Sequence, residues 1–287
     1  MLSERRDGVL VVRAPAKVNL FLEVLAKRPD GYHEVATLMV AVSLYDTLAF
    51  KEDPSGAIRL RCDAAELSTG PDNLVCKAAA LLRQRSGCTR GADVRLSKRI
   101  PMAAGLAGGS TDCAAALQGL NRLWRLGLAR DELVRLGGEL GSDVPFFFHT
   151  PAAWCTGRGE VVAPVALGRP LDFVIAKPAV GLSTAEVYRG VTVPDRPETG
   201  EEVRRALAAG DVEEIGRRLH NRLQEAAERL RPEIATGLER LRAQGPAGQM
   251  MSGSGTSLFA LCRDSGEAQR IARELQPLRV YVVRSCS

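Results

Sequence analysis

The chain has 287 residues, of which 45% are hydrophobic and 25% charged, so it is long enough for one large domain or two ordinary ones. The formal charge is +5, but the sequence contains no run of basic residues interleaved with aromatic ones, and aromatics make up only 5% of the chain. Both features argue against nucleic-acid binding. No apolar run reaches the ~20 residues that span a bilayer and no secretory signal is evident, so we expect a cytoplasmic protein without membrane contact. Seven cysteines without a C-x-x-C pair argue against both a disulfide framework and a zinc site.

The hydrophobic pattern predicts an α+β protein with two domains, 1–165 and 166–287, divided where Pro164 and Gly168 to Pro170 interrupt it. In the first domain we expect strands at 9–13, 17–26, 34–42 and 46–52, a helix at 73–86, a strand at 92–100, helices at 111–126 and 131–140, and strands at 152–156 and 160–163. Asp131 is expected to cap the helix at 131–140. In the second domain we expect a strand at 171–176, helices at 183–189, 200–209, 211–229 and 232–243, a strand at 256–262, a helix at 265–275 and a strand at 279–284.

The most informative segment is the glycine-rich loop from Pro101 to Asp112, which lies between a predicted strand and a predicted helix. Glycines let a backbone approach an anion, and the unpaired N–H groups at a helix N-terminus favour phosphate, so the loop indicates a phosphorylated ligand. Ser110, Thr111 and Asp112 offer side chains that could cap the helix. The loop matches neither the Walker nor the dinucleotide pattern, and the alternative is a turn that only packs a helix on a sheet.

Two further segments carry unusual polar residues. Lys17 and Asn19 lie two apart in a largely apolar strand and therefore share one face, where they are costly unless they line a polar cavity. An edge strand with a solvated face is the alternative. Asp143 stands between Gly141 and a run of proline and phenylalanine, where desolvation could tune its basicity, although an ordinary turn residue would look the same.

Together these segments resemble the motifs of the GHMP kinase superfamily, with the glycine-rich run Met251 to Ala260 as the third motif. Asp72-Asn73-Leu74 and Gly157-Arg158-Gly159-Glu160 also fit, and the landmarks span residues 14 to 260 in the family's order. The best match within the superfamily is the kinase of the non-mevalonate isoprenoid pathway whose small-molecule alcohol substrate carries a cytidine diphosphate. The resemblance implies an active site in a cleft between an N-terminal domain with a left-handed β-α-β crossover and a ferredoxin-like C-terminal domain.

The resemblance also implies residue roles in transfer of the ATP γ-phosphoryl group to an alcohol. Asp143 would accept the hydroxyl proton, with Lys17 beside it, and magnesium is expected with ATP, for which Ser110 is the best protein ligand. The implied ATP-binding residues are Asn73, Leu74, Lys98, Pro101, Met102, Ala103, Ala104, Gly105, Leu106, Ala107, Gly108, Gly109, Ser110 and Thr111. The implied substrate-binding residues are Asn19, Tyr32, His33, Thr184 and Tyr188, with Tyr32 and Tyr188 sandwiching cytosine and His33 pairing with it.

Some residues depart from the family pattern or have no assigned role. Ala103, Ala104 and Ala107 stand where glycine is common, and because alanine keeps φ negative, the loop is expected to be stiffer. His149 and His220 are interpreted as structural. The sequence leaves open a homoserine or mevalonate type of kinase, against which Tyr32-His33 and Thr184 with Tyr188 argue, and a non-catalytic binding protein, against which Lys17 and Asp143 argue. It does not give the oligomeric state.

Overall fold

The computed structural model describes residues 1–6 and 8–286, and of Leu2 and Arg6 it describes only the backbone. The chain divides into two compact units that are not simply its two halves. The first unit contains Met1–Ala16, Leu44–Ile100 and Ala107–Phe148, and the second contains Lys17–Ser43, Pro101–Leu106 and His149–Ser287. The domain boundary at residue 165 stays a prediction.

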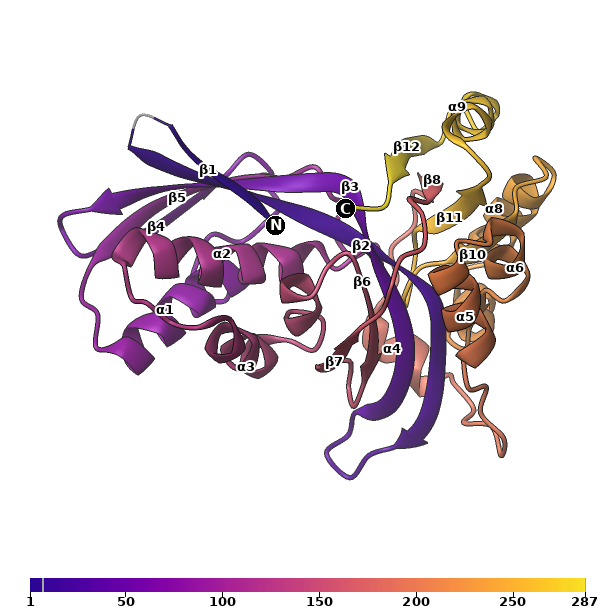
Figure 1. Cartoon of the computed structure of the whole chain (residues 1–287), viewed down its shortest axis with the longest axis horizontal. Helices are drawn as coiled ribbons and strands as arrows, with labels where there is room; N and C mark the ends of the chain where they lie inside the picture. Colours follow the sequence, from indigo (N-terminus) through magenta and orange to yellow (C-terminus); the bar gives the residue numbers. More distant parts are fainter. Residues whose placement is uncertain (7, 287) are drawn as a thin grey trace. The chain divides into compact units, whose positions relative to one another are not determined.

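The first unit is a sheet with helices on one side (Figure 1). β1 (Leu2–Arg6) pairs antiparallel with the start of β2 (Val9–Lys27), and the end of β3 (His33–Asp53) pairs antiparallel with β5 (Gly91–Ser97). β4 (Ile58–Cys62) runs parallel to β5, with α1 (Leu74–Ser86) as the crossover between them. The left hand expected of this crossover stays a prediction. The other elements of this unit are α2 (Gly108–Trp124), α3 (Arg130–Leu140) and a 3-10 turn at Pro145–Phe148.

Helix α2 packs closely on the sheet because of its sequence. Its apolar residues, from Cys113 to Leu117 and at Leu120, Leu123 and Trp124, are all buried, as the helical spacing predicts. A Cβ at Gly119 would lie 2.5 Å from the ring of Phe50, so glycine at this position allows the close approach.

The second unit contains a four-stranded antiparallel sheet in the order β10 (Gly248–Met251), β11 (Leu258–Cys262), β8 (Asp172–Lys177), β12 (Arg279–Arg284). Helices connect β8 to β10, and α9 (Ser265–Glu274) connects β11 to β12, which is the ferredoxin-like arrangement expected from the resemblance. The helices between β8 and β10 are α4 (Thr184–Arg189), α5 (Glu201–Ala209), α6 (Val212–Arg217), α7 (Gln224–Leu230) and α8 (Glu233–Arg242).

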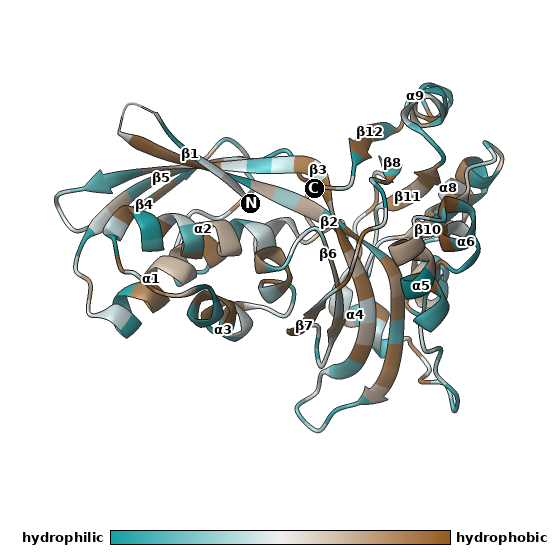
Figure 2. Ribbon diagram, viewed as in Figure 1, coloured by the Kyte–Doolittle hydropathy of each residue, from teal (hydrophilic) through white to brown (hydrophobic). Residues whose placement is uncertain are grey.

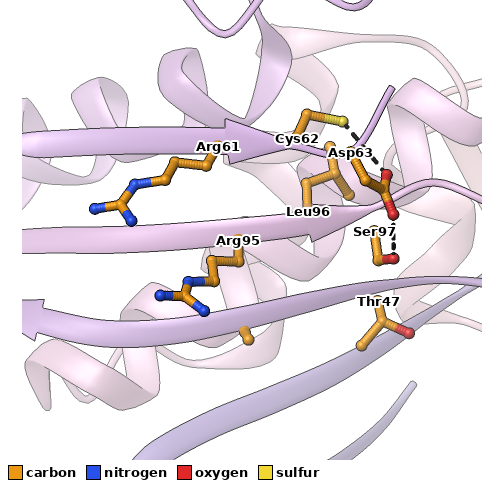
Figure 3. A pocket seen from close by; sticks show the side chains of 8 residues that line it. Thr47, Arg61, Cys62, Asp63, Arg95, Leu96 and Ser97 are labelled. Atoms are coloured by element: carbon orange, nitrogen blue, oxygen red, sulfur yellow. Dashed lines mark hydrogen bonds between the residues drawn. The ribbon is translucent and has the colours of Figure 1, made fainter. Parts of the chain in front are cut away.

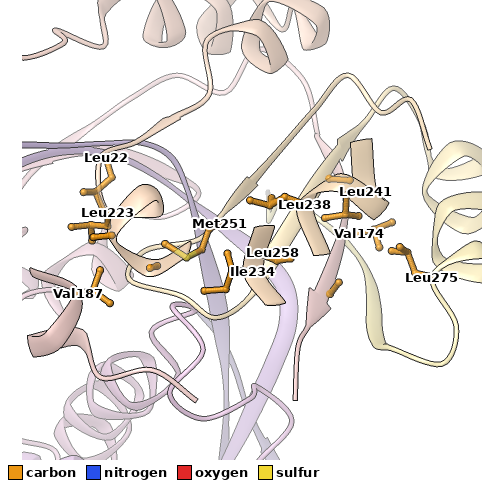
Figure 4. Close-up of a cluster of buried hydrophobic side chains, with 14 of the residues drawn as sticks. Leu22, Val174, Val187, Leu223, Ile234, Leu238, Leu241, Met251, Leu258 and Leu275 are labelled. Atoms are coloured by element: carbon orange, nitrogen blue, oxygen red, sulfur yellow. The ribbon is translucent and has the colours of Figure 1, made fainter. Parts of the chain in front are cut away.

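Three further strands of the second unit, β6, β7 and β9, are connected by pairing to the long strands β2 and β3. The start of β3 pairs with β6 (Ala152–Thr156), which in turn pairs with β7 (Val161–Pro164). β2 pairs in parallel with the short β9 (His220–Asn221). Figure 4 shows the core of this unit, in which Leu22 of β2 lies with Val174, Leu223, Ile234 and Met251. Figure 2 shows apolar residues along β2 and β3 and hydrophilic ones on the outer helices α5 and α9.

Several predicted boundaries are wrong, although most predicted elements exist. The strands predicted at 9–13 and 17–26 are one strand, β2, and those at 34–42 and 46–52 are one strand, β3. Pro15 does not end β2, since the pattern of buried residues continues through it. The sequence prediction omitted β1, β4 and β10. The expected cap at Asp131 is wrong as well, because α3 begins after Ala129, whose N–H is bound by the Glu132 carboxylate.

The predicted helix 211–229 is interrupted by β9 between α6 and α7. The cause is the buried carboxylate of Glu23 in β2, which accepts hydrogen bonds from Arg222 at 2.7 and 2.8 Å and lies 3.2 Å from Nε2 of His220. Burial opposes the charge, but Arg222, His220 and the N–H groups of Glu198 and Val24 lower the pKa of Glu23 well below its usual range. His220 thus has the structural role expected of it.

Candidate functional site

Lys17 and Asn19 share a face of β2, as predicted, and both are almost wholly buried, with 3% and 1% of their surface exposed. Lys17 Nζ donates to Asn19 Oδ1 at 2.7 Å and to the carbonyl oxygen of Gly105 at 2.8 Å. Asn19 Nδ2 donates to Thr37 Oγ1 at 2.8 Å, and Thr37 donates onward to the Phe21 carbonyl. This burial excludes the alternative of a solvated edge strand. The network holds the lysine in one orientation.

The first half of the glycine-rich loop, Pro101 to Leu106, is held against the third motif. Gly105 has φ +72°, and a Cβ there would lie 1.9 Å from the carbonyl oxygen of Ser252, so only glycine fits. Ser252 Oγ donates to the Gly105 carbonyl at 3.0 Å, and the Ser257 N–H donates to the Ala104 carbonyl at 3.1 Å. The Gly105 carbonyl therefore joins Lys17 to the loop Ser252–Thr256.

Asn221 and Ser252 are two further buried polar residues of this site. Neither was predicted from the sequence as a site residue. Asn221 Nδ2 donates to the carbonyl oxygens of Met251 and Gly253, both at 2.8 Å, and so supports the loop from the side of β9. A Cβ at Gly253 would lie 3.2 Å from Lys17 Nζ, which shows how closely the loop approaches the lysine. Ser252 belongs to the third motif, which is the signal in the sequence that could have identified it. Asn221 lies in the segment 211–229, which the sequence pattern predicts to be one helix, and no local signal distinguishes it.

Four of the predicted substrate residues take part in three contacts within the second unit. The rings of His33 and Tyr188 lie 5.1 Å apart at an angle of 31°, and Thr184 Oγ1 lies 2.8 Å from Ser254 Oγ. Tyr32 is 53% exposed, with the Arg158 guanidinium 4.9 Å from its ring centre. Burial and the charge of Lys27 lower the pKa of His33 below its ordinary value, which favours the neutral imidazole, able to donate and accept at once.

The second half of the glycine-rich loop forms the start of α2 in the first unit. The helix begins at Gly108, three residues before the prediction, and its N-cap is Ala107, which offers no capping side chain. The expected capping by Ser110, Thr111 and Asp112 is therefore wrong. The expectation of negative φ at the alanines is also wrong, since Ala103 and Ala107 have φ of 47° and 55°. Tertiary contacts impose on these alanines a conformation that costs them energy.

This uncapped helix start offers what an anion binds. The first N–H groups of α2 have no capping side chain, and within the described residues the buried Thr111 hydroxyl has no hydrogen-bond partner. The Ser110 hydroxyl in the same turn likewise forms no hydrogen bond to another described residue. Backbone donors, the helix dipole and two hydroxyls together suit a phosphate group.

Lys98 occupies a buried cluster with two carboxylates. Its ammonium group contacts Asp46 and donates to Asp112 Oδ2 at 2.8 Å. Asp46 also accepts the N–H groups of Arg99 and Ile100, at 2.6 and 2.9 Å. Burial, together with the charge of Asp46, raises the pKa of Asp112 to about 8, whereas burial opposes the charge of Lys98, and Asp112 and Asp46 raise its pKa. The cluster joins β3, the segment after β5 and α2, a role for Lys98 that the sequence did not indicate.

Asn73 and Leu74, the other predicted nucleotide residues, begin α1. Asn73 caps this helix by accepting the Val75 N–H at 2.8 Å, and its amide donates to the Ser68 carbonyl at 2.6 Å. Asp143 is half-buried and lies within the turn 141–144, which is closed by a hydrogen bond from the Val144 N–H to the Gly141 carbonyl. Its pairing with Lys17 stays a prediction.

A hollow of about 340 Å³ lies on β3, β4 and β5 (Figure 3). Arg61 and Arg95 face each other across the paired strands, and Arg61 is bound to Asp93 at 2.8 Å. Asp63, at the other end of the hollow, contacts Ser97 Oγ and accepts the Lys98 N–H at 2.8 Å. Asp63 thus fixes the backbone that leads into the Lys98 cluster.

No helix within the described ranges 1–6 and 8–286 is long and apolar enough to cross a membrane. The seven cysteines are free in this part of the chain. Nor do the described residues contain a group of three or more His, Cys, Asp or Glu side chains that could hold a metal ion.

Comparison with known proteins matches two parts of the chain to one family. Residues 73–150 match the model "GHMP kinases N terminal domain" and residues 203–278 match "GHMP kinases C terminal". The 4-diphosphocytidyl-2-C-methyl-D-erythritol kinase of Symbiobacterium thermophilum is 44% identical, over 96% of this chain and 99% of its own length. The protein of the same name from Shouchella clausii is 42% identical, over 95% and 93%. A crystal structure of 4-(cytidine 5'-diphospho)-2C-methyl-D-erythritol kinase superposes with a TM-score of 0.82 at 36% identity, over 96% of this chain and 100% of that one.

Proposed function

Because the chain belongs to the GHMP kinase family and is an ATP-dependent kinase, we propose that it phosphorylates the 2-hydroxyl of 4-diphosphocytidyl-2-C-methyl-D-erythritol in the non-mevalonate isoprenoid pathway. One observation supports this proposal most. Inside the second unit, Lys17 is linked through the Gly105 carbonyl to Ser252, and the loop that Ser252 begins is linked through Ser254 to Thr184 at the start of α4. The same helix carries Tyr188, whose ring lies against His33.

The chemical step that we propose uses Asp143 and Lys17. The Asp143 carboxylate accepts the proton of the acceptor hydroxyl while the hydroxyl oxygen forms a bond to the γ-phosphorus. The bond from that phosphorus to the β,γ-bridging oxygen breaks, and ADP leaves. The Lys17 ammonium stabilises the charge on the transferring group. The network around Asn19 and Gly105 orients Lys17 in advance, which is the kind of preorganisation that phosphoryl transfer requires.

ATP binding falls to the glycine-rich loop and its flanks. We propose that the backbone from Pro101 to Thr111 holds the triphosphate, with Asn73, Leu74 and Lys98 next to the nucleotide. Ser110 is the side chain that fits a Mg²⁺ ligand, since its hydroxyl lies in the first turn of α2 and no described residue hydrogen-bonds to it. With phosphates and water as its other ligands, bound Mg²⁺ would neutralise charge on the phosphates.

The acceptor is recognised, in this proposal, by its cytosine. Tyr32 and Tyr188 stack on the base, and neutral His33 pairs with its edge, while Asn19 and Thr184 contact the rest of the substrate. A homoserine or mevalonate kinase would have no use for this aromatic set. The presence of both Lys17 and Asp143 argues against a non-catalytic binding protein on the same fold. The proposal is tested by measuring ADP release with the cytidine-containing alcohol, homoserine and mevalonate as acceptors.

Tyr188→Ala is expected to weaken acceptor binding by about 5- to 150-fold, because a base–aromatic stack contributes roughly 1–3 kcal/mol. Tyr188→Phe keeps the ring and should have little effect on acceptor binding, and ATP binding should hardly change in either variant. Calorimetric titration of both variants with the acceptor and with an ATP analogue measures these affinities.

Tyr188 also packs partly against the core of the second unit, so Tyr188→Ala is expected to lower the Tm. The stacking role therefore depends on the affinity of the protein that remains folded. An unchanged acceptor affinity in folded Tyr188→Ala, together with a large fall in Tm, would leave Tyr188 as a core residue only.

A further inference from the structure

Lys177, the last residue of β8, has an ammonium group that is fully occupied by three hydrogen bonds. Nζ donates to the carbonyl oxygens of Pro178 and Val180, both at 2.8 Å, and to Thr256 Oγ1 at 2.7 Å. An ammonium group has three N–H donors, so none is left for a ligand. Burial and the nearby charge of Arg279 lower the pKa of Lys177, in keeping with an enclosed position.

The partners of Lys177 belong to two segments on which the proposed substrate site depends. Thr256 ends the loop that begins at Ser252, and its side chain is completely buried. Pro178 and Val180 belong to the irregular segment 178–183, which leads directly into α4. Thr256 Oγ1 itself donates to the Val180 carbonyl at 2.9 Å, so Lys177, Thr256 and Val180 form a closed triangle of hydrogen bonds.

This triangle is one of three contacts that hold segment 178–183, beside a hydrogen bond from Arg231 Nε to the Gly181 carbonyl at 3.2 Å and the packing of Leu182 on the core. The segment belongs to no helix or strand, and the carbonyls of Pro178 and Val180 turn toward Lys177. Thr184, the residue directly after this segment, makes a second contact with the loop Ser252–Thr256, because its Oγ1 lies 2.8 Å from Ser254 Oγ. Without Lys177 the Pro178 carbonyl loses its donor and the Val180 carbonyl keeps only Thr256 Oγ1. Because an enclosed carbonyl without a donor is costly, the segment is expected to shift toward new partners. Helix α4, which has only six residues, would move with it.

We propose that Lys177 is a positioning residue for the acceptor: through Thr256 and the Val180 carbonyl it sets the place of α4, and so of Tyr188, relative to the loop Ser252–Thr256. This inference rests on the function proposed above, because it assigns Tyr188 to acceptor binding. Lys177 itself touches no substrate. The effect of its loss falls on the acceptor and leaves ATP binding unchanged.

The test compares Lys177→Met, which removes the donors, with Thr256→Val, which removes the hydroxyl at nearly constant shape, and Thr256→Ser, which keeps it. Lys177→Met should raise the KM for the acceptor by about tenfold, the consequence of losing hydrogen bonds to enclosed carbonyls. Thr256→Val should raise that KM in the same direction, Thr256→Ser should restore it, and the KM for ATP should stay within about twofold. The double variant Lys177→Met/Thr256→Val should be no worse than Lys177→Met, because both changes break one network. Lys51→Met, at an exposed position of β3, is the matched control.

Amide hydrogen exchange of the free enzyme gives a second readout that needs no substrate. Faster exchange over residues 178–190 in Lys177→Met and Thr256→Val, with wild-type exchange in Thr256→Ser, is expected. Wild-type protein that releases no ADP with the cytidine-containing acceptor refutes the proposed function, whereas this exchange pattern separately supports or refutes the positioning of α4.

A lower Tm with an unchanged KM for the acceptor would reduce Lys177 to a stability role and overturn the inference. A raised KM in Lys177→Met alone, with Thr256→Val behaving as wild type, would instead indicate direct contact with the acceptor and also overturn it. If Lys177→Met does not fold, the Thr256→Val and Thr256→Ser pair decides.

Discussion

Asp143→Asn is expected to lower kcat by about 10²–10⁴, the range for loss of a positioned general base. The amide is nearly the same size as the carboxyl group but does not accept the proton of the acceptor hydroxyl. ATP affinity should change little, because the phosphates are assigned to the glycine-rich loop. Steady-state kinetics with saturating ATP and acceptor, together with a titration of the ATP analogue, measure both quantities.

Asp131→Asn serves as the control, since Asp131 is an exposed carboxylate at the start of α3. It should retain wild-type kcat and Tm. If Asp143→Asn retains most of its turnover and only its Tm falls, Asp143 is the turn residue that its neighbours Gly141 and Pro145 also allow.

Lys17→Met is expected to lower kcat by about 10²–10³, the usual cost of removing one preorganised electrostatic group. Methionine has a similar length, but it removes the donor that Lys17 supplies to Asn19 Oδ1 and to the Gly105 carbonyl, which keeps only its hydrogen bond from Ser252 Oγ. The variant should therefore also have a lower Tm than the wild type. Kinetics are to be measured at a temperature where far-UV circular dichroism shows the variant folded.

The double variant Lys17→Met/Asp143→Asn separates two readings of these losses. Residues that act on one transition state lose their effects together, so the double variant should be far more active than the product of the single losses predicts. Fully multiplicative losses would mean that Lys17 and Asp143 act independently, which contradicts their joint role in the proposed step.

The spacing of apolar residues was sufficient to predict those helices and strands whose buried residues follow a single regular spacing. The buried side of α2 and the apolar run of β2 from Lys17 to Val24 were predicted because their side chains report one environment each. β4 was missed although Ile58 and Leu60 alternate with arginines, since five residues between turn signals are a weak pattern. The predicted helix 211–229 has helical composition throughout, and the partners at its interruption, Glu23 in β2 and the loop Ser252–Thr256, are distant in the sequence.

In the candidate site, too, some residues were predictable from the sequence and others were not. Lys17 and Asn19 were recognised because polar residues on one face of a buried strand are anomalous within the sequence itself. The carboxylate partners of Lys98 come from β3 and α2, and the pairing of three distant segments leaves no local signal. The positive φ of Ala107 was likewise not predictable, because tertiary contacts there override the preference of alanine for negative φ.

The most direct test of the central claim is coupled ADP release from the purified enzyme, with ATP and Mg²⁺, measured in parallel with three acceptors. Turnover is expected with 4-diphosphocytidyl-2-C-methyl-D-erythritol and only background with homoserine or mevalonate, because we propose that Tyr32, His33 and Tyr188 recognise cytosine. Comparable kcat/KM for homoserine or mevalonate, or no ADP release above background with the cytidine-containing alcohol, would contradict the proposed function.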